Sequence, residues 1–233
     1  MKVLHVTRDF PPRVNGGLST AVGGLTRALQ TTHVEQAIVS FDGYRPSSRP
    51  GDAADVTPQI HHGIPIARVS SPSQLPAARA FARDERPDVV QVHQGMLWDF
   101  ATEVAQGAPR VFSVHLIQRL LRELRGLDEP TRSERDQARA FADAEAVTLP
   151  SEACRPHLPP SARTRAILAP LGIHDHPAAR AAVGQPRPPA TFLYVGRFGD
   201  VKGTQQLLEA IGEVHRHHPD VRFVIAGGLP DNP

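Results

Sequence analysis

Short apolar runs alternate with segments of helical spacing along most of this chain. The first helix is the clearest, since Leu18, Val22, Leu25 and Leu29 recur every three or four residues. The predicted strands are Val3–Thr7, Ala37–Ser40, Ile66–Val69, Val89–Val92, Val111–Val114, Ala146–Leu149 and Ala166–Leu168. This alternation predicts an α/β fold built on a parallel sheet.

A proline-rich stretch separates these elements from a second, shorter strand-helix-strand pattern. The second pattern comprises an apolar run at Thr191–Val195, a helix from about Thr204 and another apolar run at Val221–Ala226. Clustered prolines interrupt regular structure and are typical of a linker. We therefore expect an N-terminal Rossmann-like domain, a linker and an incomplete C-terminal Rossmann-like domain, at residues 1–176, 177–189 and 190–233 respectively.

The loop between the first strand and the helix of the second pattern, Gly196–Gly203, carries the strongest chemical signal. Its glycines allow the backbone to turn sharply, and Arg197 and Lys202 place two positive charges beside the start of a helix. The free N–H groups of a helix N-terminus already favour anions. The loop therefore predicts a phosphate or diphosphate site.

A second glycine loop follows the first strand. Asp9 and the pair Gly16-Gly17 lie between that strand and the first helix, where open α/β sheets bind ligands. Glycines there would let a ligand approach the backbone N–H groups, but an ordinary β–α turn explains them equally well. The spacing differs from G-x-G-x-x-G, so no nicotinamide or flavin site is indicated.

Two histidines each stand at the end of a predicted strand. His93 follows Val89–Val92 and His115 follows Val111–Val114, so both should reach the carboxyl edge of the sheet. A neutral imidazole there can form a hydrogen bond with a sugar hydroxyl or carbonyl. One such histidine would be an ordinary loop residue, whereas two beside a glycine turn favour a polar pocket.

Composition excludes several classes of function. The chain has 233 residues, of which 21% are charged, and its net charge is +2 with the basic residues dispersed, so nucleic acid is not an expected partner. Its single cysteine, Cys154, cannot form an internal disulfide. No apolar run approaches about 18 residues, so we expect no membrane span and a cytoplasmic location. The remaining histidine clusters lack tetrahedral ligand spacing, so no metal is expected: His174, His176, His215, His217 and His218.

Taken together, these segments resemble the retaining glycosyltransferases of the two-domain GT-B fold, a group that includes glycogen synthases and phosphatidylinositol mannosyltransferases. The likeness extends along most of the chain and rests on segments in the family's order: Val6–Pro12 with Gly16–Leu18, Pro87–His93, Phe112–His115, Ala142–Ser151 and Val195–Gly203. The resemblance implies a GT-B fold with a complete first domain and the first β-α-β part of the second.

The resemblance also implies roles for individual residues. Gly16 and Gly17 would contact the donor diphosphate from one domain, and Arg197 and Lys202 from the other. His115 would contact the donor sugar. The reaction would transfer a sugar from a nucleotide diphosphate sugar to an acceptor hydroxyl with retention, without a metal or other cofactor. His93 and Asp9 are candidates for a sugar or acceptor pocket.

Two departures from the family pattern limit this expectation. Leu171 and His174 stand where the family's Pro-Asn-Gly-(Val/Ile)-Asp segment has Asn and Asp. The family's second domain also normally continues for on the order of 100 residues, and it carries two glutamates that bind the donor sugar and the ribose. We therefore expect a truncated chain with little activity alone, which a second chain could complete. The alternatives are a non-catalytic subunit that binds sugar or acceptor, and a nucleotide-sugar epimerase.

Overall fold

The computed structural model of the protein describes residues 1–14, 16–44, 56, 58–173, 181, 190–199 and 202–228. It divides into two compact units, Met1–Ile173 and His174–Pro233. The predicted linker 177–189, apart from Ala181, and the two histidines His174 and His176 lie outside the described residues.

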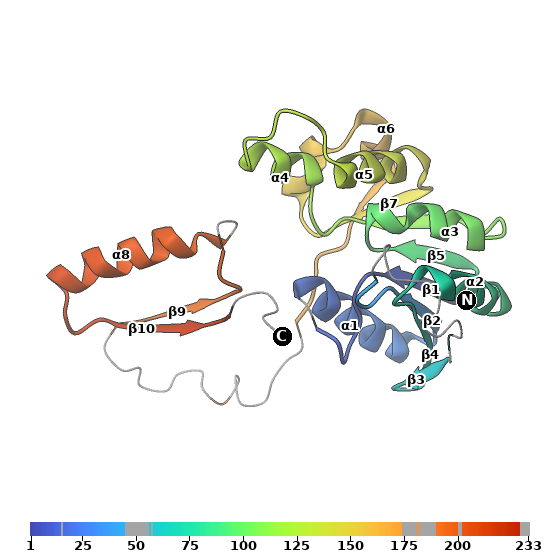
Figure 1. The fold of residues 1–233 in the computed structure, drawn as a ribbon, viewed down its shortest axis with the longest axis horizontal. Helices are drawn as coiled ribbons and strands as arrows, with labels where there is room; N and C mark the ends of the chain where they lie inside the picture. The colour runs from blue at the N-terminus through green and yellow to red at the C-terminus, as the bar shows by residue number, and fades with distance from the viewer. Residues whose placement is uncertain are drawn as a thin grey trace. The chain divides into compact units, whose positions relative to one another are not determined.

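The N-terminal unit contains an eight-stranded sheet in the order β3-β4-β2-β1-β5-β6-β7-β8 (Figure 1). All neighbouring strands are parallel except β3 and β4, which form an antiparallel pair. The strands are β1 Lys2–Thr7, β2 Glu35–Ser40, β3 Gln59–His61, β4 Ile64–Arg68, β5 Val89–Val92, β6 Arg110–Ser113, β7 Ala146–Leu149 and β8 Ala166–Leu168.

Helices cover both faces of this sheet, as parallel sheets require. The α1 side holds a small cluster in which Val22 packs near Ile38 and Ile66. The alternate strand residues, among them Leu4 and Val39, belong to a larger core that includes residues of α2, α3 and α5. The helices of the unit are α1 Gly17–Leu29, α2 Leu75–Asp84, α3 Trp98–Val104, α4 Gln118–Leu124, α5 Arg132–Asp143 and α6 Pro160–Arg163.

The sequence predicted seven of these eight strands, with end differences of at most two residues. The largest differences are at the starts of β2 and β4, which begin at Glu35 rather than Ala37 and at Ile64 rather than Ile66. The prediction missed β3, whose central residue Ile60 is exposed. The β3–β4 turn uses His62 and Gly63, both with positive φ, which is the signature of a tight hairpin.

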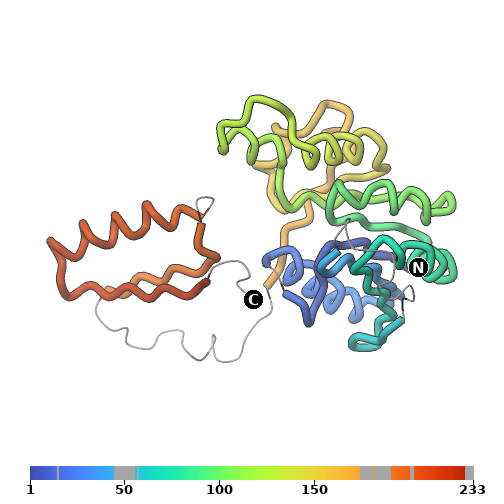
Figure 2. The backbone as a smooth tube through the Cα atoms, in the orientation of Figure 1, coloured from blue at the N-terminus to red at the C-terminus, as the bar shows by residue number. Residues whose placement is uncertain are grey.

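The C-terminal unit contains β9 Thr191–Val195, α8 Thr204–His217 and β10 Arg222–Ala226. The two strands are parallel, and α8 lies along them in the trace (Figure 2). The predicted strand-helix-strand pattern is confirmed, and His215 and His217 lie in the last turn of α8.

None of the helices in the described part of the chain is both long and apolar enough to cross a membrane.

Candidate functional site

The sheet order identifies one edge of the N-terminal unit as the place for a ligand. Strand β1 lies between β2 and β5, so the order of connections reverses there, and ligands of open α/β sheets bind at the carboxyl ends beside such a reversal. Residues Asp9, Gly16 and Gly17 follow β1, and His93 and His115 follow β5 and β6. The structure therefore collects these predicted site residues at one sheet edge.

Two side chains hold the loop that follows β1: Asp42, just after β2, and Arg68 of β4. The buried carboxylate of Asp42 accepts hydrogen bonds from the Phe10 N–H at 3.0 Å and from the Ser40 hydroxyl at 2.8 Å, and it is ion-paired with Arg68. Arg68 also donates to the carbonyl oxygens of Phe10, at 3.1 Å, and Pro11, at 2.5 Å. Asp42 and Arg68 thus fix the loop, and sequence reasoning missed both because they are distant in the chain.

The glycine turn leads from this loop into α1. Gly16 is the N-cap residue with φ 157°, and among the described residues no side chain caps the helix. The α1 start therefore leaves its first N–H groups without a side-chain cap, as an anion site requires. Further along α1, a Cβ on Gly23 would lie 2.8 Å from Cγ of Pro11, so glycine lets the helix approach the loop.

Three histidines form a row across β1, β5 and β6. His5 Nδ1 lies 3.3 Å from His93 Nε2, and His93 Nδ1 lies 3.1 Å from His115 Nε2. His5 and His93 are buried, and His115 is half-buried at the end of the row. The prediction that His93 and His115 share an edge is confirmed by this contact. His5 was not predicted, because it lies inside a strand.

Burial keeps these imidazoles neutral at physiological pH. Loss of water lowers the pKa of His5 and of His115 from the ordinary 6.5 to about 4. Burial also lowers the pKa of His93 well below 6.5, and the neighbouring His5 and His115 add to that shift. Neutral rings can both donate and accept hydrogen bonds, as contacts with sugar hydroxyls require.

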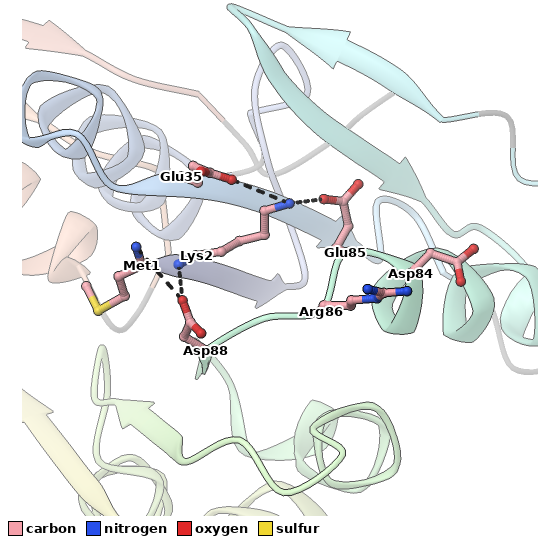
Figure 3. A pocket seen from close by; sticks show the side chains of 7 residues that line it. All are labelled: Met1, Lys2, Glu35, Asp84, Glu85, Arg86 and Asp88. Atoms are coloured by element: carbon pink, nitrogen blue, oxygen red, sulfur yellow. Dashed lines mark hydrogen bonds and ion pairs between the residues drawn. The ribbon is translucent and has the colours of Figure 1, made fainter.

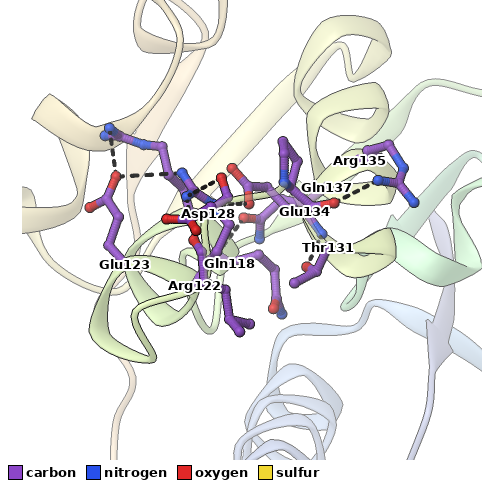
Figure 4. Close-up of polar contacts among 11 residues, drawn as sticks. Gln118, Arg122, Glu123, Asp128, Thr131, Glu134, Arg135 and Gln137 are labelled. Atoms are coloured by element: carbon purple, nitrogen blue, oxygen red, sulfur yellow. Dashed lines mark hydrogen bonds and ion pairs between the residues drawn. The ribbon is translucent and has the colours of Figure 1, made fainter.

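The segment after His115 is tied to α5. Gln137 accepts from the Gln118 N–H at 2.8 Å and donates to the Leu116 carbonyl at 2.7 Å. Arg122 of α4 donates to Glu134 of α5 at 2.8 Å (Figure 4). The side chains of this pair are only 17% and 16% exposed, and the pair joins the two helices.

The predicted phosphate loop lies in the C-terminal unit, between β9 and α8. Thr204 Oγ1 accepts from the Gly199 N–H at 3.0 Å, and the Tyr194 hydroxyl donates to the Arg197 carbonyl at 3.2 Å. The α8 N-cap residue, Gly203, has φ 63°, a left-handed conformation that favours glycine. The loop places the Lys202 charge one residue before that N-cap.

Close packing between backbones shapes the same loop. A Cβ on Gly227 would lie 1.9 Å from the Gly196 carbonyl oxygen, so only glycine allows this approach. The Phe198 N–H donates to the Gly228 carbonyl at 2.8 Å, which attaches the loop to the end of β10. The glycines after β10 therefore help to hold the loop after β9 in place.

Two cavities of the N-terminal unit lie away from the row of histidines. One, of about 560 Å³, is at the amino ends of the strands, where Lys2 pairs with Glu85 at 3.0 Å and with Glu35 at 3.7 Å (Figure 3). The predicted site is at the carboxyl ends of the strands, which is the opposite edge of the sheet. Because of this position and its paired charges, the cavity is not the predicted site. The other, of about 390 Å³, is lined mainly by apolar residues such as Ile117, Phe141 and Leu158.

Within the described ranges, no group of three or more His, Cys, Asp or Glu side chains is placed to hold a metal ion. The ring nitrogens of His5, His93 and His115 face one another in pairs and do not converge on a common point.

Comparison with known proteins identifies the class. Residues 16–172 match the glycosyl transferase 4-like domain, and residues 175–232 match glycosyl transferases group 1. Because the first match covers more than half of the chain, the protein belongs to the glycosyl transferase 4-like family.

A curated relative and two solved structures show the same likeness. The GDP-mannose:cellobiosyl-diphosphopolyprenol alpha-mannosyltransferase of Xanthomonas oryzae pv. oryzae is 28% identical over 247 residues, covering 97% of this chain and 60% of that protein. Sucrose-phosphate synthase from Thermosynechococcus elongatus has a TM-score of 0.66 at 16% identity, covering 96% of this chain and 61% of that one. TarM of S. aureus has a TM-score of 0.68 at 8% identity, covering 98% and 73%.

These comparisons establish the fold as the GT-B type. The chain spans about three fifths of the length of the mannosyltransferase and of the sucrose-phosphate synthase.

Proposed function

We propose that this chain carries the acceptor-side domain and part of the donor-side domain of a retaining glycosyltransferase. The reaction transfers a sugar from a nucleotide diphosphate sugar to an acceptor hydroxyl. The observation that carries the proposal is the order of the two glycosyltransferase matches, each containing a glycine loop at the carboxyl end of a parallel strand. Both loops lead into a helix N-terminus, where phosphate groups bind.

The two loops supply the donor phosphate contacts. Gly16 and Gly17 expose the N–H groups at the start of α1, and Arg197 and Lys202 contribute positive charge at the start of α8. The charge that develops on the leaving phosphate is stabilised by such donors and cations, so the residues can promote departure without a metal.

His115 contacts the donor sugar in this proposal, and His93 and Asp9 border the sugar or acceptor pocket. A neutral His115 suits this role because its ring can form a directed hydrogen bond with a hydroxyl. Such contacts hold the anomeric carbon in place, and orientation of this kind supplies several kcal/mol of barrier reduction.

The rest of the donor-side domain, with the two glutamates that the family resemblance implies, comes from residues outside these 233, in the same polypeptide or in a second chain. The alternative is a non-catalytic role in binding sugar or acceptor. Measured turnover of substrate distinguishes the enzyme from this binding subunit. The chain alone should therefore bind nucleotide more readily than it turns over substrate.

Calorimetric titration with GDP and UDP tests the phosphate site directly. The variant with both Arg197→Ala and Lys202→Ala should lose most of the binding, and binding to the wild type should weaken with added salt, since exposed charges are screened within roughly 8 Å at physiological ionic strength. His115→Ala should leave the affinity for GDP unchanged because its contact is with the sugar.

A matched control lies in the same unit. Arg216, in the last turn of α8, and Arg222, at the start of β10, are cations at the opposite end of the strand-helix-strand unit. Replacing both with alanine removes the same charge but should preserve binding. Equal binding by the Arg197/Lys202 variant and the wild type would show that the loop is only a β–α turn.

Transfer is tested with GDP-mannose first, because the mannosyltransferase relative is named for that donor. The chain is assayed alone and with whatever polypeptide continues or accompanies it, using hydroxyl acceptors that include lipid-linked disaccharides. NMR of the product's anomeric proton decides between retention and inversion. Isomerisation of the nucleotide sugar without an acceptor would instead support the epimerase alternative.

A further inference from the structure

The row of three histidines does not end at His5, because a glutamine on the next strand lies beside it. Gln36 of β2 donates from Nε2 to the carbonyl oxygen of Thr26 in α1 at 3.0 Å. This bond fixes the orientation of the amide, since turning it over would place Oε1 against another carbonyl oxygen. Gln36 Oε1 is therefore directed away from Thr26.

Two buried polar atoms on neighbouring strands are complementary. Gln36 Oε1 and His5 Nε2 are both buried, and neither has a hydrogen-bond partner among the described residues. In the register of β1 and β2, Gln36 lies opposite Val3, so its side chain and that of His5 lie on the same face of the sheet. The Gln36 side chain also favours the protonated form of His5 and so raises its pKa, against the larger effect of burial. Unpaired buried polar atoms are costly, and a proton on His5 Nε2 directed toward Gln36 Oε1 would satisfy both atoms.

The donor-to-acceptor direction at His5 determines the direction of each following hydrogen bond in the row, because a neutral imidazole has one donor and one acceptor nitrogen. His5 Nδ1 must accept, so His93 donates to it from Nε2 across 3.3 Å. His93 Nδ1 must then accept, so His115 donates to it from Nε2 across 3.1 Å. The one ring nitrogen left over is Nδ1 of His115, to which no described residue donates.

We infer that Gln36, His5 and His93 are positioning residues that hold His115 in its Nε2–H tautomer and so present its Nδ1 as a hydrogen-bond acceptor. The inference rests on the proposed function for its ligand: a sugar hydroxyl that donates to His115 Nδ1. A carbonyl or an ether oxygen cannot fill this role because neither carries a proton. The row thus selects for a hydroxyl in the donor sugar.

Histidine ¹⁵N NMR tests the row without any substrate, because protonated and unprotonated ring nitrogens have well-separated shifts. At neutral pH, all three rings of the wild-type protein should be neutral Nε2–H tautomers, assigned by single substitutions. A proton on Nδ1 of His115, or a charged His115 ring, would overturn the inference whatever the function is.

A pair of glutamine variants tests whether the direction is set from Gln36. Gln36→Met removes the oxygen at the start of the row, so the ring-nitrogen shifts of both His5 and His115 should move toward values of mixed tautomers. The control is Gln91→Met: Gln91 lies on β5, on the other side of β1 from Gln36, and donates to Ser113 at 2.8 Å rather than to a histidine of the row. Unchanged His115 shifts in a folded Gln36→Met protein would also overturn the inference.

Adding GDP-mannose as a probe separates the inference from the proposed function. If both hold, the His115 Nδ1 shift changes on binding while the tautomer stays the same. If the tautomers are as stated but the probe binds without affecting His115, the row of histidines stands and the sugar contact is wrong.

Discussion

The N-terminal and C-terminal units contain the same local pattern in different surroundings. In both, a strand is followed by a glycine loop, a helix and a second parallel strand, as in β1-α1-β2 and β9-α8-β10. Five of the six residues of β1 are buried, whereas four of the five residues of β9 are exposed. No residue of α8 is buried, although three residues of α1 are.

The difference shows that burial is a property of the layers around an element and not of the element's own sequence. Strand β1 has neighbours on both sides and helices over both faces. Among the described residues, β9 pairs only with β10, and its apolar residues Phe192, Leu193 and Val195 are exposed. Parallel strands are stabilised by coverage of both faces, so we expect the same pattern to be less stable in the second unit.

The test with the largest expected effect on stability makes one substitution in each unit. Leu4→Ala removes a fully buried side chain from the main core of the N-terminal unit, so it should lower the free energy of unfolding by about 2–5 kcal/mol. Leu208→Ala, on α8, changes a side chain that is 57% exposed and should cost less than about 0.5 kcal/mol.

Urea denaturation followed by circular dichroism measures both variants. A cost for Leu208→Ala that equals the cost for Leu4→Ala would contradict the comparison, since it would mean that α8 is covered in solution.

The second test compares a buried ion pair with an exposed one. Asp42→Ala leaves Arg68, Ser40 and the Phe10 N–H without their shared acceptor, which should cost about 3 kcal/mol. Glu213→Ala breaks exposed pairs on α8 and should have an effect of at most about 0.5 kcal/mol.

The midpoint of urea denaturation is again the measurement. If Asp42→Ala proves as mild as Glu213→Ala, the first loop is not held by Asp42. Asp42→Asn, which keeps one acceptor oxygen, should fall between the two.

The fold was predictable from sequence where mostly apolar runs alternate with helical spacing, and the site only where its residues end strands. Strands β5, β7 and β9 follow from short, mostly apolar runs, and His93 follows from its place after one of them. Strand β3 is too short and too exposed for alternation to show it. The loop-holding pair Asp42 and Arg68 depends on which strands become neighbours, and that order is a tertiary property.

The places of His5 and Gln36 in the buried row were also not predictable from the sequence. His5 and Gln36 occupy strand positions that normally carry apolar residues, so the pattern of β1 and β2 indicates strands but not a polar row between them. Their roles depend on the register between β1 and β2 and on the hydrogen bond from Gln36 to α1. Single positions in a sequence carry no signal for such contacts.

The third test uses pH. Burial lowers the pKa of His5 and His115 to about 4, whereas an unfolded histidine titrates near 6.5, so the unfolded chain binds more protons between these values. Stability therefore falls as the pH is lowered from about 6.5 to about 4.

Urea midpoints measured at pH 7 and pH 5 should differ less in His5→Gln than in the wild type. His215→Gln is the matched control in the C-terminal unit and should keep the wild-type difference. An identical pH dependence in His5→Gln and the wild type would show that His5 is not held neutral.

The smallest expected effect concerns one hydrogen bond in the phosphate loop. Thr204 Oγ1 accepts from the Gly199 N–H at 3.0 Å, so Thr204→Val removes a bond worth about 1 kcal/mol while keeping the side-chain volume. The Gly199 amide should then exchange with water about fivefold faster, since exchange follows the local opening free energy. Thr204→Ser keeps the hydroxyl and should retain the wild-type rate. Equal rates in all three proteins, measured by water-exchange NMR, would mean that Thr204 does not hold the loop in the C-terminal unit. The contrast with the fixed loop of the N-terminal unit would then be larger than the structure indicates.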